Sequence, residues 1–243
     1  MNGDFQDARV LTVGTPKGGA GKTTSCFNIA GGLAKRGGRV HLIDLDRSDS
    51  NISGQLSRWR TYDGAKATGM TCATPSADSL AEYLDTVRAS GAYDWILIDV
   101  AGKLEQSLMT AMNDAELTIV PVMVGDEGSA HEAAKIIRTM CAMFKKHGAV
   151  FSYRVLFTRC PFILSAPDKH VISEVERMQL RRFASVLHDR PVYREGGFTG
   201  FPVHYVDASR EAATKAATEL DSLLDEIEDA LGVGTTAQIE GVA

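Results

Sequence analysis

The chain has 243 residues, 26 Lys and Arg against 31 Asp and Glu, and a formal net charge of -5. Its 44% hydrophobic and 23% charged residues are ordinary for a globular protein and exclude disorder as the main state of the chain. The longest apolar stretches, residues 95–98 and 117–124, are far shorter than the roughly 20 residues of a membrane-spanning helix, and four cysteines without a CxxC pair argue against a disulfide framework or a zinc site.

Short apolar segments alternate along the chain with segments of helical periodicity. Five segments predict buried strands: residues 10–15, 40–45, 95–100, 117–122 and 153–157. Five others predict helices: residues 22–35, 80–90, 132–144, 171–187 and 215–231. The alternation predicts an α/β fold, a doubly wound and mostly parallel sheet flanked by helices, as a single domain over residues 1–231 with a flexible tail over residues 232–243.

A glycine-rich segment, TPKGGAGKTT at residues 15–24, lies between the first strand and the first helix. Its glycines let successive N–H groups point at one anion, which the helix N-terminus also attracts. Lys22 would neutralise phosphate charge, and the Thr23 hydroxyl would complete a Mg²⁺ shell. Position 16 is proline, so the segment departs from the GxxxxGK[ST] pattern. The residues predicted to hold the phosphates are Gly18, Gly19, Ala20, Gly21, Lys22, Thr23 and Thr24.

Carboxylates lie at the carboxyl ends of the next two predicted strands. The second strand ends in LIDLD at residues 42–46, and the third in WILIDVAG at residues 95–102. In an open parallel sheet, ligands bind beyond the carboxyl ends of the strands. Asp44, Asp46 and Asp99 are therefore predicted to lie beside the glycine-rich loop.

The loop with a lysine at its start, KGGAGKT at residues 17–23, resembles the deviant Walker A motif of the ParA/MinD family of P-loop ATPases. LIDLD is similar to the family's LIDxD element, WILIDVAG to its Walker B strand and switch loop, and residues 115–122 to its next core strand. The resemblance covers most of residues 10–124. Two departures concern the switch regions: Arg47-Ser48-Asp49 stands where the family usually has Asp-Pro-Gln, and Gly102-Lys103 replaces a frequent Pro-Pro.

The resemblance implies a P-loop ATPase of the deviant Walker A type with ATP and Mg²⁺ as cofactors. Lys17 would extend across a nucleotide-sandwich homodimer to the partner's phosphates, so Lys17, Lys22 and Asp46 are the implied catalytic residues, with Asp46 orienting the attacking water. Thr23, Asp44 and Asp99 are the implied Mg²⁺ residues, Asp99 through a water. No guanine-reading NKxD motif follows residues 153–157, and adenine as the base depends on the resemblance.

Charge is unevenly distributed along the chain. Residues 135–215 carry 14 Lys and Arg and 7 Asp and Glu, whereas residues 219–240 carry seven acids and no base. Family members that bind membrane have a basic amphipathic C-terminal helix, so the acidic last helix disfavours membrane binding. Members that bind nucleoid DNA use Lys and Arg of the C-terminal half. The residues predicted to contact nonspecific DNA are Arg177, Arg181, Arg182, Arg194 and Lys215, with Arg177 and Arg181 on one helix face.

The resulting hypothesis is a short ParA-type partition ATPase that is cytoplasmic, and nucleoid-associated when bound to ATP. About nine residues precede the first strand, too few for a helix-turn-helix domain. The ATP-bound homodimer would position a plasmid, chromosome or other cargo with a ParB-like or cargo-bound partner that stimulates hydrolysis. Two alternatives stay open: a small-molecule P-loop ligase or kinase of the dethiobiotin-synthetase kind, and an iron–sulfur reductase resembling the nitrogenase iron protein. The second requires cluster cysteines, for which Cys141 and Cys160 are available, but Cys141 is predicted to lie in the core instead.

Overall fold

The computed structural model describes residues 8–45, 54, 70–100 and 105–233. Within them, six strands form one sheet in the order β3-β2-β4-β1-β5-β6, and every pairing is parallel. The predicted doubly wound α/β fold is confirmed. The strands are β1 (Arg9–Val13), β2 (Val40–Asp44), β3 (Met70–Ala73), β4 (Trp95–Asp99), β5 (Leu117–Met123) and β6 (Tyr153–Thr158).

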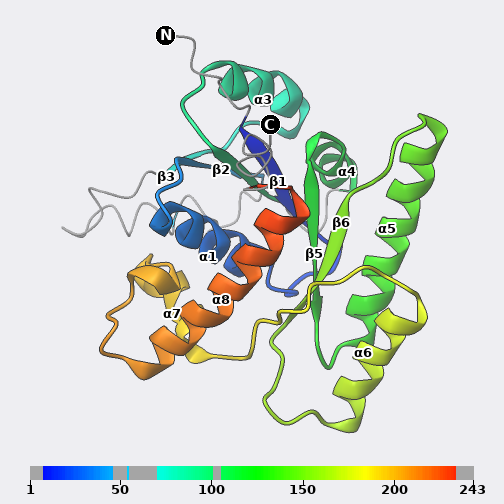
Figure 1. Cartoon of the computed structure of the whole chain (residues 1–243). Coiled ribbons are helices and arrows are strands. Elements are labelled where there is room, and N and C mark those ends of the chain that lie inside the picture. The colour runs from blue at the N-terminus through cyan, green and yellow to red at the C-terminus, as the bar shows by residue number, and fades with distance from the viewer. Residues whose placement is uncertain (1–7, 46–53, 55–69, 101–104, 234–243) are drawn as a thin grey trace, which may run out of the picture.

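Helices cover both faces of the sheet (Figure 1). One face is covered by α1 (Lys22–Lys35), α7 (Pro191–Thr199) and α8 (Glu211–Ala230). The other face is covered by α3 (Leu80–Ala89), α4 (Glu105–Asp114), α5 (Glu127–Lys146) and α6 (Ala166–Arg177). Short 3-10 helices occupy Ala77–Ser79 and Val203–Tyr205. Among the residues that the structure describes, no helix combines the length and apolarity needed to cross a membrane.

The strands divide their side chains between two hydrophobic cores. In β1, Val10 belongs to the core under α3–α6 and Leu11 to the core under α1, α7 and α8. Ile96 and Leu97 of β4 divide in the same way, because successive side chains of a strand point to opposite faces. Burial on both faces explains why these strands are mostly apolar in sequence rather than alternating between apolar and polar residues.

The topology places β1 next to the centre of the sheet, between β4 and β5. The chain leaves β1 through α1 toward β2 on one side, and later crosses from β4 through α4 to β5 on the other side. The strand order therefore reverses beside β1. The crevice beyond the carboxyl end of β1 is where open α/β sheets bind their ligands.

The helix predicted over residues 171–187 is wrong in its second half, because α6 ends at Arg177. Gln179 takes a left-handed φ of 54°, and the Leu180 N–H donates to the carbonyl of Val175 at 3.2 Å. This is a Schellman helix end, in which glycine usually occupies the left-handed position. Because this position holds glutamine rather than glycine, the sequence does not indicate that the helix ends here. The following residues run beside β6, where Val155 N donates to Arg181 O at 2.8 Å.

Besides the two 3-10 helices, three elements of the described chain were not among the predicted strands and helices: β3, α4 and α7. Strand β3 has only four residues, and α7 has nine, of which Gly196 and Gly197 are adjacent glycines. Segments this short give little periodicity, and adjacent glycines weaken a helical pattern.

Candidate nucleotide-binding site

The glycine-rich loop connects β1 to α1 at the crevice. Gly19 and Gly21 have left-handed φ values of 77° and 86°, which favour glycine. Gly21 is the N-cap of α1 and provides no side-chain cap, so no side chain occupies the end of the helix. A helix N-terminus with unsatisfied N–H groups attracts an anion.

Lys22, the first residue of α1, lies folded back over this loop. Its Nζ donates to the carbonyl oxygen of Lys17 at 2.9 Å, and the residue is only 8% exposed. The hydroxyl of Thr15, at the start of the loop, is buried without a hydrogen-bond partner among the described residues. The loop, the buried ammonium group and the helix end together form a cradle suited to phosphate.

Two side chains that could hold Mg²⁺ are in contact. The Thr23 hydroxyl donates to Oδ2 of Asp99 at 2.6 Å. Asp44 lies opposite Asp99 in the pairing of β2 with β4, and both carboxylates are buried. Burial raises the pKa of the Cys26 thiol well above its usual range, and the nearby charges of Asp99 and Asp44 raise it further. Thr23, Asp44 and Asp99 thus surround one region.

This donor set fits Mg²⁺, which prefers oxygen ligands and usually keeps several waters beside one or two carboxylates and the phosphates. Within the described ranges, no cluster of three or more His, Cys, Asp or Glu side chains could hold a metal ion alone. The Thr23 hydroxyl and the two carboxylates supply only part of a Mg²⁺ coordination shell, and phosphate and water oxygens would complete it. Such a site needs no cluster of three protein ligands of the kind that is absent from the described residues.

Lys17 lies at the other end of the loop, beside α5. Its Nζ is 3.0 Å from Oδ2 of Asp126, with the two side chains 36% and 23% exposed. Asp126 is the N-cap of α5, and a Cβ added at Gly128 would lie 3.3 Å from the Lys17 ammonium. The missing side chain of Gly128 therefore leaves room for Lys17 at the start of α5. The lysine that would act across a dimer is paired within its own chain.

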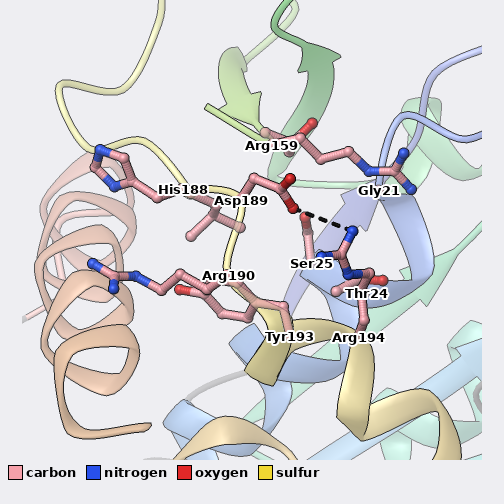
Figure 2. A pocket seen from close by; sticks show the side chains of 11 residues that line it. Gly21, Thr24, Ser25, Arg159, His188, Asp189, Arg190, Tyr193 and Arg194 are labelled. Atoms are coloured by element: carbon pink, nitrogen blue, oxygen red, sulfur yellow. Dashed lines mark ion pairs between the residues drawn. The ribbon is translucent and has the colours of Figure 1, made fainter. Parts of the chain in front are cut away.

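A pocket opens beside the loop (Figure 2). One wall of the pocket is formed by Gly21, Thr24 and Ser25, and the opposite wall by residues 187–190, Tyr193 and Arg194. At the end of β6, the pocket is lined by Thr158 and Arg159. The Thr158 hydroxyl donates to the carbonyl of Ala20 at 2.9 Å, which fixes the end of β6 to the loop. An organic group attached to phosphates in the cradle would lie in this pocket.

One carboxylate of α8 holds the wall of the pocket formed by residues 187–194. Glu219, whose side chain is 10% exposed, accepts hydrogen bonds from His188 N at 2.7 Å and from Tyr193 Oη at 3.1 Å. It also lies 2.8 Å from Nδ1 of His188 and accepts from Nε of Arg190 at 3.1 Å. Burial, and then the Glu219 charge, raise the pKa of the Tyr193 phenol.

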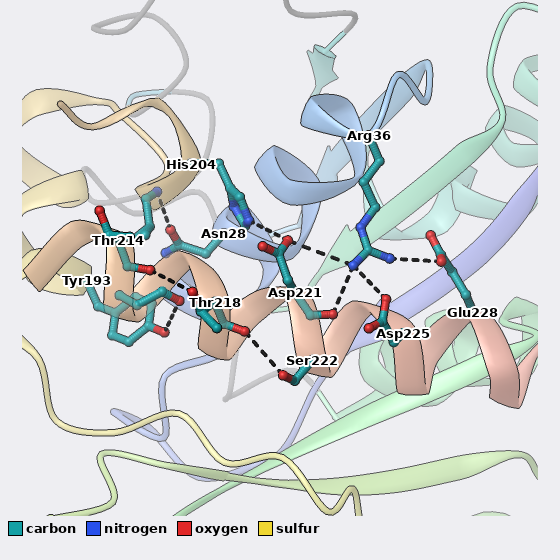
Figure 3. Close-up of polar contacts among 12 residues, drawn as sticks. Asn28, Arg36, Tyr193, His204, Thr214, Thr218, Asp221, Ser222, Asp225 and Glu228 are labelled. Carbon is teal, nitrogen blue, oxygen red and sulfur yellow. Dashed lines mark hydrogen bonds and ion pairs between the residues drawn. The ribbon is translucent and has the colours of Figure 1, made fainter. Parts of the chain in front are cut away.

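α8 is fixed in turn to α1 (Figure 3). Arg36, just after α1, forms ion pairs with Asp225 at 2.7 Å and Glu228 at 2.9 Å. Asn28 of α1 accepts a hydrogen bond from Val203 N and donates one to the carbonyl of Thr24, each at 2.8 Å. The helix that carries Glu219 and the helix that begins at the phosphate cradle are therefore held together by polar contacts.

The structure brings the predicted loop residues together with Asp44 and Asp99. Asp46, the predicted water-orienting carboxylate, lies outside the described residues. Asp126 and Glu219 were not predicted. Asp126 lies three residues after β5, whereas Asp44 and Asp99 are the last residues of β2 and β4, so a carboxylate near the carboxyl end of a strand was the available signal for Asp126. Glu219 offers no local signal because its partners come from another segment. Cys141, predicted to lie in the core, is exposed on α5.

The five predicted DNA-contacting residues do not lie on one helix. Arg177 ends α6, Arg181 and Arg182 lie beyond it, Arg194 belongs to α7 and lines the pocket, and Lys215 belongs to α8. Four of them pair with carboxylates: Arg177 with Glu174 at 2.7 Å, Arg182 with Glu176 at 3.4 Å, Arg194 with Asp189 at 3.6 Å and Lys215 with Glu211 at 2.6 Å. The prediction that Arg177 and Arg181 share a helix face is wrong, because α6 ends before Arg181.

Known proteins resemble this chain over nearly its whole length. A family model described as VirC1 protein matches residues 8–230. Protein virC1 of Rhizobium radiobacter is 31% identical over 190 residues, which cover 76% of this chain and 78% of that protein. Maintenance of carboxysome distribution protein A of Halothiobacillus neapolitanus is 25% identical over 223 residues, 90% of this chain and 96% of that protein.

A shorter match links the chain to the chromosome partitioning protein ParA of Caulobacter vibrioides, 31% identical over 149 residues that cover 47% of this chain and 55% of that protein. Among solved structures, the septum site-determining protein MinD of Pyrococcus horikoshii, complexed with Mg-ADP, superposes with a TM-score of 0.70 at 21% identity, covering 96% of this chain and 100% of that one. An ATP complex of Cyanothece McdA superposes at 0.66 with 17% identity, covering 94% and 98%. These structures share the fold.

Proposed function

The chain belongs to the VirC1 family of ParA/MinD-type P-loop ATPases, and from this premise we propose that it is a Mg²⁺-dependent ATPase that dimerises when it binds ATP and positions a cargo. Its relatives include proteins named for chromosome partitioning and for carboxysome distribution. The cargo of this chain is proposed only as a class, a DNA molecule or a large assembly that is moved or retained.

ATP is the proposed nucleotide. The triphosphate would lie on the N–H groups at the start of α1 with Lys22 above it, and the base and ribose would occupy the pocket between Thr24 and Tyr193. Structures that share the fold were solved with Mg-ADP and with ATP. Thr23, Asp44 and Asp99 would hold Mg²⁺, which neutralises phosphate charge when bound.

Hydrolysis is proposed to need a second copy of the chain. Lys17 of one protomer would neutralise charge that develops on the phosphates bound by the other, and Asp46 would orient the attacking water. The ion pair of Lys17 with Asp126 is partly exposed and contributes only about 0–1 kcal/mol. A triphosphate of much greater charge can replace Asp126 as its partner. Turnover of the isolated chain is therefore expected to be slow.

The ATP-bound dimer is proposed to bind duplex DNA through the phosphate backbone. It would therefore show no sequence preference, because such contacts carry no sequence information. A ParB-like or cargo-bound protein would stimulate hydrolysis and release the dimer. The protein would then be cytoplasmic, and associated with the nucleoid while ATP is bound.

The observation that carries the proposal is a pair of lysines five residues apart: Lys22, buried at the start of α1 over the phosphate cradle, and Lys17, partly exposed beside it. The test is light scattering with ATP, a non-hydrolysable analogue and ADP, together with ATP turnover with and without DNA. We expect a dimer only with the triphosphates and turnover that rises with DNA. A monomer under all conditions would contradict the proposal, and turnover that requires a small organic acceptor would favour a P-loop ligase or kinase.

A further inference from the structure

The positive charge of the C-terminal half is concentrated in one stretch. Residues 133–167 contain no Asp or Glu and six Lys and Arg: Lys135, Arg138, Lys145, Lys146, Arg154 and Arg159. Residues 168–215 contain eight Lys and Arg but seven Asp and Glu. The excess of positive charge therefore belongs mostly to the first stretch, which begins within α5.

The structure shows how the second stretch is neutralised. Six of its eight cations lie 2.6–3.6 Å from a carboxylate: Arg177, Arg182, Arg190, Arg194, Arg210 and Lys215. A cation that already pairs with a carboxylate offers little net charge to a distant phosphate. To bind DNA, each would first have to give up its carboxylate.

Four cations of α5 have a different environment. Lys135, Arg138, Lys145 and Lys146 are exposed, and in the described part of the chain none of them forms an ion pair. At 3.6 residues per turn, their side chains fall within an arc of about 100°, opposite the buried Ala133, Ile137 and Met140. We name these four residues the α5 basic face.

Arg181 lies at the edge of the α5 basic face. Its charge is close enough to Cys141 to oppose the rise that partial desolvation on the helix surface causes in the pKa of that thiol. Cys141 is three residues after Arg138 and four before Lys145, so it adjoins both on the helix surface. No carboxylate pairs with the Arg181 guanidinium among the described residues. A fifth exposed cation, from a separate segment, thus lies near Cys141 and the α5 basic face.

We propose that the α5 basic face is the surface that contacts the phosphate backbone of duplex DNA in the ATP-bound protein; this inference rests on the proposed function. The face is about 17 Å long, and duplex DNA carries one charge per about 1.7 Å of axis, so all four cations can meet phosphates at once. Ala142 is the only other residue of this arc between positions 135 and 146. A helix that binds a lipid surface needs bulky apolar residues, so DNA fits better than an anionic membrane.

The position of α5 provides a route for nucleotide control. The helix begins directly after Asp126, which pairs with Lys17 of the nucleotide loop, and the α5 basic face occupies its last three turns. A change at Lys17 on dimerisation would act on the start of this helix. Pairing two chains also doubles the number of cations available to one duplex, which strengthens binding by linking two sites.

The test is fluorescence anisotropy with a duplex of arbitrary sequence, measured with ATP, ADP and no nucleotide over a salt series. The wild type is compared with a fourfold variant, Lys135→Glu, Arg138→Glu, Lys145→Glu and Lys146→Glu. A matched variant reverses the same number of paired cations, Arg177→Glu, Arg182→Glu, Arg210→Glu and Lys215→Glu. We expect ATP-dependent binding by the wild type. The fourfold variant should bind at least about tenfold more weakly, and its salt dependence should fall by about 0.9 log unit per lost phosphate contact. The matched variant should bind like the wild type.

The possible outcomes distinguish a failure of the proposed α5 surface from a failure of the proposed function. ATP-dependent dimerisation of both variants shows that they are folded, and four glutamines replace the four glutamates if charge reversal unfolds the chain. Loss of DNA binding in the matched variant and its retention in the fourfold variant would overturn the α5 surface and leave the proposed function standing. A wild type that dimerises with ATP and binds phosphatidylglycerol vesicles but no DNA would overturn both the α5 surface and the DNA binding in the proposed function, and would leave the ATP-dependent dimer standing.

Discussion

Lys17 and Lys22 are five residues apart in one loop, yet their environments give them different roles. The Lys22 ammonium is buried and held by the carbonyl of Lys17, so its position is already set before a phosphate arrives. Lys17 is partly exposed, and its partner Asp126 is a single carboxylate. An ion pair of this kind stabilises by only about 0–1 kcal/mol, so it can exchange for a stronger anion.

This contrast predicts different losses for the two lysines. Lys22→Ala should weaken ATP binding by at least about tenfold, which is about 1.4 kcal/mol, because a charged contact to phosphate is removed. Lys17→Ala should bind ATP as the wild type does but remain monomeric. Titration with a fluorescent ATP analogue and light scattering measure the two properties. Asp126→Ala, which keeps Lys17 and removes only its partner, should still dimerise; a dimer of Lys17→Ala would contradict the assignment.

The environment of His41 in β2 predicts how the folding stability depends on pH. The residue is buried, its ring nitrogens contact the hydroxyls of Thr71 at 2.6 Å and Tyr83 at 2.9 Å, and burial lowers its pKa from 6.5 to about 4. The unfolded chain therefore binds a proton below pH 6.5 that the folded chain accepts only near pH 4. Folding stability should fall as the pH decreases through this window, by about 2 kcal/mol between pH 7 and pH 5.

Urea unfolding at pH 7 and pH 5 measures this loss in the wild type and in His41→Gln. Glutamine cannot titrate, so the variant should lose about 2 kcal/mol less between the two pH values than the wild type does. Equal losses in both proteins would show that other groups cause the acid destabilisation.

Whole elements were predictable from the sequence where burial produces a local pattern. The strands β1, β2, β4, β5 and β6 bury apolar side chains on both faces, so each appears as a short segment of mostly apolar residues. The end of α6 was not predictable, because Gln179 takes a left-handed conformation that glycine usually marks. The loop residues and strand-end carboxylates of the site follow local rules, whereas the contact of Glu219 with His188 joins residues 31 apart and depends on how α8 packs.

At the scale of elements, α8 holds the segment after α6 with two carboxylates. Glu226 accepts hydrogen bonds from the backbone N–H groups of Ala184 at 2.6 Å and Ser185 at 2.7 Å. Glu219 lies seven residues earlier, two turns along the same face, and binds residues that line the pocket. The first carboxylate fixes the segment, and the second fixes the wall that would contact the nucleotide.

The two glutamates therefore form a matched pair for mutation. Glu219→Gln should raise the Kd for ATP by about tenfold, because the charged contact to Arg190 and His188 is lost and the pocket wall loosens. Glu226→Gln should change the Kd by no more than about twofold, although it lowers thermal stability similarly. Calorimetric titration with ATP and thermal unfolding measure both effects. Equal changes in Kd would mean that Glu219 acts only through the stability of the chain.

At the scale of the whole molecule, the proposed active site is divided between two chains. Asp46→Ala removes the carboxylate proposed to orient water but leaves Lys17 and the phosphate cradle in place. This variant should bind ATP, dimerise and remain on DNA without hydrolysis. Sedimentation with DNA and phosphate release measure the two properties, and phosphate release at the wild-type rate would refute the role of Asp46.

Division of the site between chains also predicts that two inactive variants restore activity when they are mixed. In a heterodimer of Lys17→Ala with Asp46→Ala, the chain that lacks Lys17 keeps Asp46 and receives Lys17 from its partner, so one of the two sites is complete. The mixture should release phosphate although neither variant does so alone. The control replaces the second variant with the double variant Lys17→Ala and Asp46→Ala, whose mixture contains no complete site. If the first mixture is as inactive as the control, Lys17 acts within its own chain, where it already pairs with Asp126.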